Sequence, residues 1–382
     1  IVVGKYVGDN ALAAVGSAGP IVNLLVCLFV GIGMGASITV SQFLGARRRE
    51  ALSRTIGNCL ILTVIASVII MVLGTLVTRP LLVALNTPES ILDWSADYLY
   101  IMFWGGAGLA FYNILSGVLR GLGDSMAALL YLVVASILNI FLDLFFVRSL
   151  GMGVSGVALA TVISQAISAV FCYWKLARMS DIFDLGLKHM KLIPAVAGRI
   201  LRIGIPSGIT QAIMATAGMV VLNLTNAMGK TVVACNVIVM RVDGFAMMPN
   251  FTFGTAATTY IGQNIGARQK DRIKRGTIDM LKLGLTVSTL LVLGILLFGY
   301  QLIHMFSTTP EVIELGIRGL RWLAFGYICF SVTQVLQGVM RAAGDTVVPM
   351  WISIITTVIL RMPLAYLLAF LTLEAVCHEP FA

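Results

Sequence analysis

Charged residues are scarce in this chain. Asp, Glu, Lys and Arg make up 11% of its 382 positions, whereas soluble globular domains carry about 25%. Hydrophobic residues make up 59%, and the mean hydropathy is +0.97. The apolar runs are about 20 residues long, too long and too numerous for one core helix or a signal peptide. They also lack the alternation of barrel strands, so the composition predicts an all-α polytopic membrane protein.

Cysteine and histidine are also few, which argues against metal, disulfide and catalytic chemistry. The six cysteines are scattered and the three histidines show no metal or triad spacing. We therefore expect no metal site, no cofactor and no catalytic residue. Gly121-Leu122-Gly123-Asp124 matches the Gly-x-Gly-Asp motif of intramembrane aspartyl proteases. The Tyr-Asp pair typical of those enzymes is missing, so we expect a protein that is not an enzyme.

The net charge of +9 could suggest nucleic acid, but the placement of the basic residues argues against it. When alternate connections are assigned to the two sides of a membrane, most Lys and Arg fall on one side. The other side holds only Lys5, Arg79, Arg148 and Lys230. This asymmetry is the positive-inside pattern and makes the basic side cytoplasmic. We expect a bilayer as partner and no nucleic acid.

The apolar runs predict ten complete membrane spans and the end of one more at Ile1 to Val3. Duplication, described next, leads us to expect twelve spans in the intact protein, with a last one after Thr372. The predicted spans cover residues 11–43, 52–77, 91–118, 126–148, 155–176, 198–227, 231–264, 278–305, 312–340 and 347–372.

Three short motifs recur in the same order in the two halves of the chain. Because each copy lies an even number of spans from its partner, the halves are parallel repeats, an arrangement known among secondary transporters. The pairs are Ser41–Arg47 with Gly262–Arg268 and Gly117–Asp124 with Gly338–Asp345, each 221 residues apart, and Thr87–Glu89 with Thr309–Glu311, 222 apart. We expect two six-helix repeats: an amino lobe at 1–178, a basic cytoplasmic linker at 179–197 and a carboxy lobe at 198–382.

The helix ends that carry these motifs favour architecture over chemistry. Glycine permits a tight turn, Asp124 and Asp345 can cap the helices that follow, and we expect the motif arginines to stay in water. In the second span Gly31 and Gly35 have the Gly-x-x-x-Gly spacing of closely packed helices.

Asp143 is the most informative residue, because a carboxylate within an apolar span must face protein or water and is by default a functional hypothesis. Asn139 lies one turn earlier on the same face. Thr161 follows the turn at Leu150 to Gly156, and at about 1.5 Å per residue we expect it level with Asp143. Asp143 could be structural, held neutral by a hydrogen bond, or could bind a proton or cation; the company of Asn139 and Thr161 favours binding.

These features together resemble the multidrug and toxic compound extrusion (MATE) family. The motifs that carry the resemblance are Gln42–Arg47, Arg120–Asp124 with Arg341–Asp345, and the set Asn139, Asp143 and Thr161. The resemblance implies two six-helix lobes, a central cavity, and export of amphipathic, often cationic compounds driven by proton or sodium entry.

The resemblance also implies which residues couple transport to ions. Asn139, Asp143 and Thr161 match in type and spacing the amino-lobe cation site of the DinF-like and archaeal type. The first-helix Asp of that site has no counterpart in this sequence. The NorM-like branch has a Glu eight residues after the Pro of the seventh helix, where this chain has Met214, and no acid lies between Leu320 and Met340. We therefore expect no carboxy-lobe sodium site of that pattern.

In the carboxy lobe, a possible cavity includes Arg241, Asp243, Met214 and Gln211. Arg241 and Asp243 are two residues apart on a helix and point to different faces, so they do not pair. For these two, and for Arg361 before Pro363, structural and functional roles both stay open. The methionines suit a surface that accepts many ligands, but also an ordinary lipid-facing or core position.

We therefore expect a monomeric, multi-pass antiporter of the cytoplasmic (inner) membrane that exports drugs and organic cations in exchange for H⁺ or Na⁺ by alternating access. A lipid-linked oligosaccharide flippase of similar fold is the nearest alternative, and a non-transporting scaffold or receptor a more distant one. Few basic residues lie at membrane depth to bind a pyrophosphate headgroup.

Overall fold

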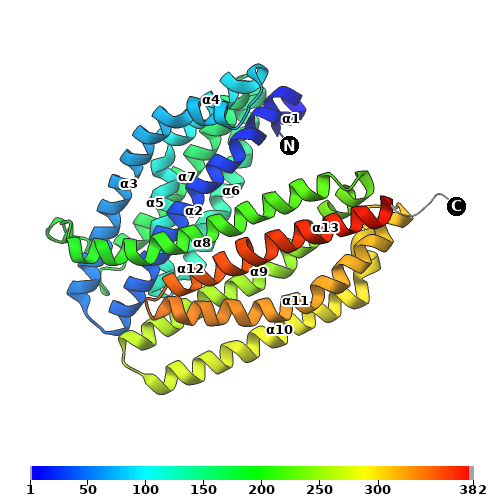
Figure 1. Cartoon of the computed structure of the whole chain (residues 1–382). Coiled ribbons are helices and arrows are strands. Elements are labelled where there is room, and N and C mark those ends of the chain that lie inside the picture. The colour runs from blue at the N-terminus through cyan, green and yellow to red at the C-terminus, as the bar shows by residue number, and fades with distance from the viewer. Residues whose placement is uncertain (1, 378–382) are drawn as a thin grey trace. The chain divides into compact units, whose positions relative to one another are not determined.

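The computed structural model describes residues 2–377 and assigns them almost entirely to helices (Figure 1). Ile1 and residues 378–382 lie outside this range. Within it, nine helices are long and apolar enough to cross a membrane, and ten if the bent pair α4–α5 counts as one span. The all-α polytopic fold is thereby confirmed.

The chain divides into two compact units, Ile1–Ala212 and Ile213–Ala382. α8 crosses the boundary between them. The helices of unit 1 are α1 Val2–Tyr6, α2 Asp9–Gly45, α3 Arg49–Ala84, α4 Glu89–Trp104, α5 Gly106–Leu122, α6 Ser125–Leu144, the π-helix η1 Phe145–Ser149, α7 Gly153–Ala177, the 3₁₀ turn η2 Leu187–His189 and the first part of α8 Pro194–Asn226. Unit 2 contains the rest of α8, α9 Lys230–Gly266, α10 Lys270–His304, α11 Pro310–Ala342, α12 Val347–Ser353, the π-helix η3 Ile354–Arg361 and α13 Met362–Cys377.

The sequence repeat is visible in the helices themselves. α2 and α9 are both 37 residues long, and both ends of α9 lie 221 residues after those of α2. The two copies differ at one point. α11 is continuous over 33 residues, whereas its counterpart in unit 1 is broken into α4 and α5, which are bent by 49°. The span predicted at 91–118 is therefore bent at Gly105, between α4 and α5.

Close packing explains the bend at Gly105. A Cβ atom on this residue would lie 2.2 Å from Cγ1 of Val162 on α7, much closer than two carbon atoms can approach. Glycine lets the end of α4 touch α7 beside Thr161.

The glycines of α2 pack as their spacing predicts. A Cβ on Gly31 would lie 2.5 Å from the Cα of Gly208 on α8, and one on Gly35 would lie 2.2 Å from the carbonyl oxygen of Ile200. Arg199 on the same stretch of α8 donates a hydrogen bond to Gln42. The amino-terminal part of α8 is thus fastened to α2 within unit 1.

The segment predicted as a linker, 179–197, packs on α3. Asn58 donates from Nδ2 to the carbonyl of Lys191 (3.1 Å) and accepts from the backbone N–H of Ile193 (2.8 Å). Ser53 accepts from the N–H of Asp184 (2.8 Å), and Phe183 is buried. These contacts follow one face of α3 and hold the segment in unit 1.

For the repeated motifs at helix ends, some of the predictions are confirmed and others are wrong. Asp124 and Asp345 cap their helices, accepting from the N–H groups of Ala127 (3.0 Å) and Val348 (3.2 Å). In the Gly-Ala-Arg motif, however, the left-handed residue is the arginine, because Arg47 has φ 54° and Arg268 has φ 57°. The expectation that glycine makes the turn is wrong for this motif and confirmed for Arg-x-x-Gly-Asp, where Gly123 has φ 95° and Gly344 has φ 93°.

The other difference concerns the arginines of Arg-x-x-Gly-Asp. Arg120 and Arg341 are partly buried and do not lie free in water. Arg341 donates to side-chain oxygens of Gln334 (3.4 Å) and Gln337 (3.2 Å). In such a position the apolar stem of an arginine packs against neighbouring helices while its guanidinium contacts polar groups.

Candidate functional site

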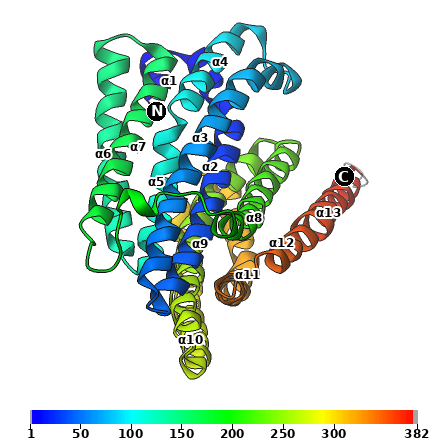
Figure 2. The same ribbon diagram turned by 90° about the vertical axis from the view of Figure 1, so that its left-hand side faces the viewer.

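Two neighbouring helices of unit 1, α6 and α7, carry the polar residues singled out in the sequence. They lie side by side in both views (Figures 1 and 2). α6 begins at the Asp124 cap and continues into η1, and a short turn with Gly151 (φ 65°) and Gly153 (φ 59°) leads directly into α7. Single-turn π-helices are frequent at functional sites, and η1 begins two residues after Asp143.

Asn139 and Thr161 meet across these helices. Nδ2 of Asn139 donates to Oγ1 of Thr161 at 3.4 Å, and this hydroxyl donates to the carbonyl of Val157 at 3.0 Å. Among the predicted site residues, the structure thus brings Asn139 and Thr161 into contact. α7 begins at Gly153, earlier than assumed, so Thr161 lies deeper along the helix and reaches Asn139.

Asp143 itself has an unsatisfied oxygen. Its Oδ1 atom is buried and has no hydrogen-bond partner in the part of the chain that the structure describes. A buried polar atom without a partner costs about 1–3 kcal/mol, and the cost is harder to recover where water is excluded. Tyr98 on α4 lies within electrostatic range of this carboxyl. The arrangement leaves room for one more proton or cation at Asp143.

Gln165 lies on the same helix as Thr161 and was not among the residues predicted for the site. It follows Thr161 by one helical turn on α7, and its Oε1 atom is also buried and unpartnered among the described residues. Its i+4 spacing from Thr161 was the available signal. Asn139, Asp143, Thr161 and Gln165 are all oxygen-bearing, so they could hold a proton or a hard monovalent cation between α6 and α7.

A second polar cluster lies in unit 2, around Asp243 on α9. The Asp243 Oδ1 atom and the Tyr327 hydroxyl are both buried, and the hydroxyl can donate a hydrogen bond to the Asp243 carboxyl. The two groups interact electrostatically across α9 and α11. Arg361, the last residue of η3, interacts with the same carboxyl and is exposed. No ion pair within 4 Å joins Arg361 to Asp243 among the described residues.

The polar groups continue inward from Tyr327. Asn250, two turns after Asp243 on α9, accepts at Oδ1 from Ser288 of α10 (2.8 Å) and donates to the backbone carbonyl of Tyr327 (3.5 Å). Tyr327 therefore reaches from the level of Asn250, at its backbone, to that of Asp243, at its hydroxyl. Ser331, one turn further along α11, is buried with an unpartnered Oγ.

The other residues predicted for a carboxy-lobe cavity are placed separately. Met214 contacts the Thr357 hydroxyl through its sulfur (3.8 Å). Arg241 is exposed and makes no ion pair within the described range. Gln211 lies on the part of α8 that belongs to unit 1.

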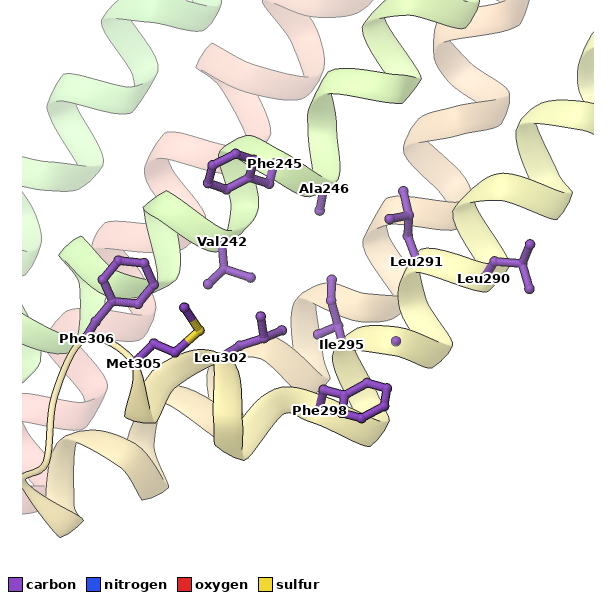
Figure 3. A pocket seen from close by; sticks show the side chains of 11 residues that line it. Val242, Phe245, Ala246, Leu290, Leu291, Ile295, Phe298, Leu302, Met305 and Phe306 are labelled. Atoms are coloured by element: carbon purple, nitrogen blue, oxygen red, sulfur yellow. The ribbon is translucent and has the colours of Figure 1, made fainter.

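An apolar pocket of about 520 Å³ opens between α9 and α10 in unit 2 (Figure 3). None of its lining side chains can make a hydrogen bond through oxygen or nitrogen, so it suits hydrocarbon. Asp243 does not line it, although its neighbours do. The lining residues are Val242, Phe245, Ala246, Leu290, Leu291, Gly294, Ile295, Phe298, Leu302, Met305 and Phe306.

Comparison with known proteins is consistent with this architecture. The MatE family model matches residues 1–145 and 206–367. The probable multidrug resistance protein YoeA of Bacillus subtilis is 30% identical over 97% of this chain and 81% of its own length, and the probable multidrug resistance protein YpnP of the same organism is 30% identical over 94% and 81%. A solved outward-facing structure of a multidrug resistance MATE family transporter of the MOP superfamily superposes with a TM-score of 0.87 at 26% identity, covering 96% of this chain and 82% of that one. The chain belongs to the MATE family: it is a multi-pass membrane transporter and not an enzyme.

Proposed function

We propose that this transporter exports amphipathic, often cationic drugs across the cytoplasmic membrane in exchange for H⁺ or, as the second choice, Na⁺. Two relatives at 30% identity are named probable multidrug resistance proteins, and this supports the drug substrates. The transporter works as a monomer. The amino lobe at 1–178 and the carboxy lobe at 198–382 alternate access, and 179–197 connects them.

One observation carries the proposal: the buried, unpartnered Oδ1 atom of Asp143 beside the Asn139–Thr161 contact. An intramembrane carboxyl is stable there only when a proton or cation neutralises it, since isolated charge in hydrocarbon is costly. A proton from outside binds Asp143, with Asn139 and Thr161 completing the site. Neutralisation of Asp143 favours a different packing of α6 against α7, and this change moves the drug outward. Release of the proton to the inside returns the amino lobe to its first arrangement.

We prefer a proton to sodium as the coupling ion because the proposed site contains one carboxyl, Asp143, which a single proton neutralises. A proton needs one basic oxygen, whereas sodium needs several oxygens around it. The site resembles the amino-lobe cation site of the family in its three matched residues, and Gln165 adds a fourth oxygen.

The carboxy lobe contributes to the drug cavity. Asp243 supplies the negative charge that an organic cation needs, and Met214 and Arg241 of the same unit are the further candidates for its lining. The family model and the names of the relatives favour an exporter of drugs over a flippase for lipid-linked oligosaccharides.

The test is ethidium efflux from cells that produce the whole protein or its Asp143→Asn variant. We expect efflux to fall to the level of cells without the transporter, while membrane insertion is unchanged. Asp97→Asn is the matched control, since Asp97 is an exposed carboxyl on α4; its efflux should equal wild type. Wild-type efflux from inserted Asp143→Asn protein would remove Asp143 from the mechanism.

A further inference from the structure

The apolar pocket between α9 and α10 has a buried base and exposed walls. Val242, Ala246 and Ile295 form its base and are 7%, 3% and 7% exposed. Phe245 and Phe298 form its walls and are 73% and 57% exposed. Figure 3 shows Phe245 on α9 and Phe298 on α10 at opposite edges of the pocket. Apolar surface exposed in this way marks a site for a membrane or for an apolar ligand.

The pocket lies in the outer half of the membrane. On α9 its lining begins at Val242, about 18 Å along the helix from Lys230. On α10 it runs from Leu290 to the end of the helix, about 20 Å. These helix ends are on the side with few basic residues, which is the outer side. One leaflet of hydrocarbon is about 15 Å thick, so the pocket extends over the depth of one acyl chain.

The outer end of the pocket is marked by two exposed aromatic rings on α10. Tyr300 stacks on His304, with the ring centroids 5.5 Å apart, and both side chains are exposed. Tyrosine is typical of the interface between membrane and water. We therefore place the lipid headgroups at the level of these two residues.

The chemistry of the lining favours a neutral hydrocarbon over a cationic drug. No lining side chain carries a charge, an oxygen or a nitrogen, so an ammonium group buried there would lose its hydration without gaining a partner. Asp243 follows Val242 in the sequence but does not line the pocket. The volume of about 520 Å³ is in the range of pockets that enclose a small ligand. A fatty acyl chain satisfies the length and the lack of charge.

Two helices that could cover the pocket pack elsewhere. α11 packs on both α9 and α10 but contributes no residue to the lining. The span expected after residue 372 corresponds, by the sequence repeat, to α7, which packs mainly on α4, α5 and α6. We therefore expect that span to pack on α11 and on the helix at 347–377, away from the pocket. The bilayer remains as the source of an occupant.

We propose that this pocket binds one acyl chain of an outer-leaflet phospholipid. The chain lies between α9 and α10 and joins the two helices by apolar contact, while the headgroup stays at the level of Tyr300 and His304. Because the lining is all hydrocarbon, the length of the acyl chain sets the affinity and the headgroup contributes little. The inference does not rest on the proposed function, since it involves neither the drug nor the coupling ion.

The experiment titrates the purified, delipidated whole protein with dioleoyl phosphatidylglycerol and follows bound lipid by native mass spectrometry. Gly294 lines the pocket, and an added Cβ would meet no atom within 4 Å, so Gly294→Leu fills the pocket without displacing protein. We expect this variant to weaken the tightest lipid-binding step about tenfold or more, because the buried chain loses its apolar contacts. The matched control is Gly326→Leu on α11, whose Cβ also meets no atom within 4 Å and which does not line the pocket; it should bind lipid as wild type.

Three further lipid titrations of the wild-type protein identify the occupant without any variant. Dioleoyl phosphatidylcholine should bind as tightly as dioleoyl phosphatidylglycerol, dioctanoyl phosphatidylglycerol should bind about tenfold or more weakly, and ethidium should not displace the tightest-bound lipid. Melting temperatures show whether Gly294→Leu is folded; if it is not, Gly294→Ala replaces it, with a smaller weakening expected. Wild-type lipid binding by the folded Gly294 variant, equal binding of the two chain lengths, or displacement of the lipid by ethidium would overturn the inference. Ethidium efflux is measured separately, so such a result leaves the proposed function standing.

Discussion

The side chain that contacts Thr161 across α6 and α7 is Asn139, at 3.4 Å, and Asp143 stands one turn away with its Oδ1 atom unpartnered. The site therefore has two parts: a polar link that fixes the spacing of the helices, and a carboxyl that is free to take up a proton or cation. This division predicts different phenotypes for the two parts.

Thr161→Val removes the hydroxyl and keeps the shape of the side chain. We expect ethidium efflux to fall several-fold without being lost, because Asn139 loses its partner on α7 while Asp143 remains. The matched control is Ser136→Ala on α6, whose hydroxyl bonds only to the carbonyl of Leu132 in its own helix (2.9 Å). Initial efflux rates from cells with equal amounts of inserted protein measure the effect; equal rates for Thr161→Val and wild type would contradict the role of the link.

Gly105→Ala places a methyl group where Val162 already lies, at 2.2 Å. We expect a loss of about 1–3 kcal/mol in stability, because α4 and α7 must move apart. Gly106→Ala is the control, since no atom lies within 4 Å of the added Cβ. Melting temperatures of the purified variants measure this loss. Equal melting temperatures of Gly105→Ala and Gly106→Ala would contradict the close packing of Gly105 against Val162.

Asn58→Leu removes two hydrogen bonds that hold the segment 179–197 on α3. Both backbone groups lose their partner, so the segment should detach and become open to trypsin at Lys188 and Lys191. Arg54→Gln, which breaks only the exposed ion pair with Glu50, should be cut at the wild-type rate. Limited proteolysis followed by gel analysis measures the rates. Protection of Asn58→Leu equal to wild type would show that the bonds do not hold the segment.

Asp124→Ala removes the helix cap of α6 and the ion pair with Lys175 (3.3 Å). Loss of an N-cap costs about 1 kcal/mol, so we expect a lower melting temperature with ethidium binding retained. Asp124→Asn keeps a capping oxygen and should recover most of the loss. If the Asn variant is as unstable as the Ala variant, the ion pair and not the cap is responsible.

The spans, the repeat and the caps at Asp124 and Asp345 could be predicted because they depend on local features: apolar run length, short motifs and capping chemistry. The bend at Gly105 could not, because it arises from contact with Val162 on another helix. The start of the helix that carries Thr161 was predicted two residues too late, because a glycine-rich stretch does not reveal at which residue the next helix begins. Helix α7 begins at Gly153 and includes Gly156.

The unit 2 cluster shows the same limit at longer range. Asp243 stood out as a charge in an apolar segment, but nothing along the chain indicates that α9 and α11 bring it to the hydroxyl of Tyr327. In the same way, Arg47 and Arg268 adopt the left-handed turn although glycine stands two residues before each. Residue type alone favoured the glycine.

The most direct measurement of the central claim is ethidium transport in proteoliposomes that contain the whole protein, with a proton gradient and a sodium gradient imposed separately. We expect transport under the proton gradient, little under the sodium gradient, and none in either case for Asp143→Asn. Transport that is equally fast without any ion gradient, or that persists in folded Asp143→Asn under the proton gradient, would contradict ion coupling at Asp143.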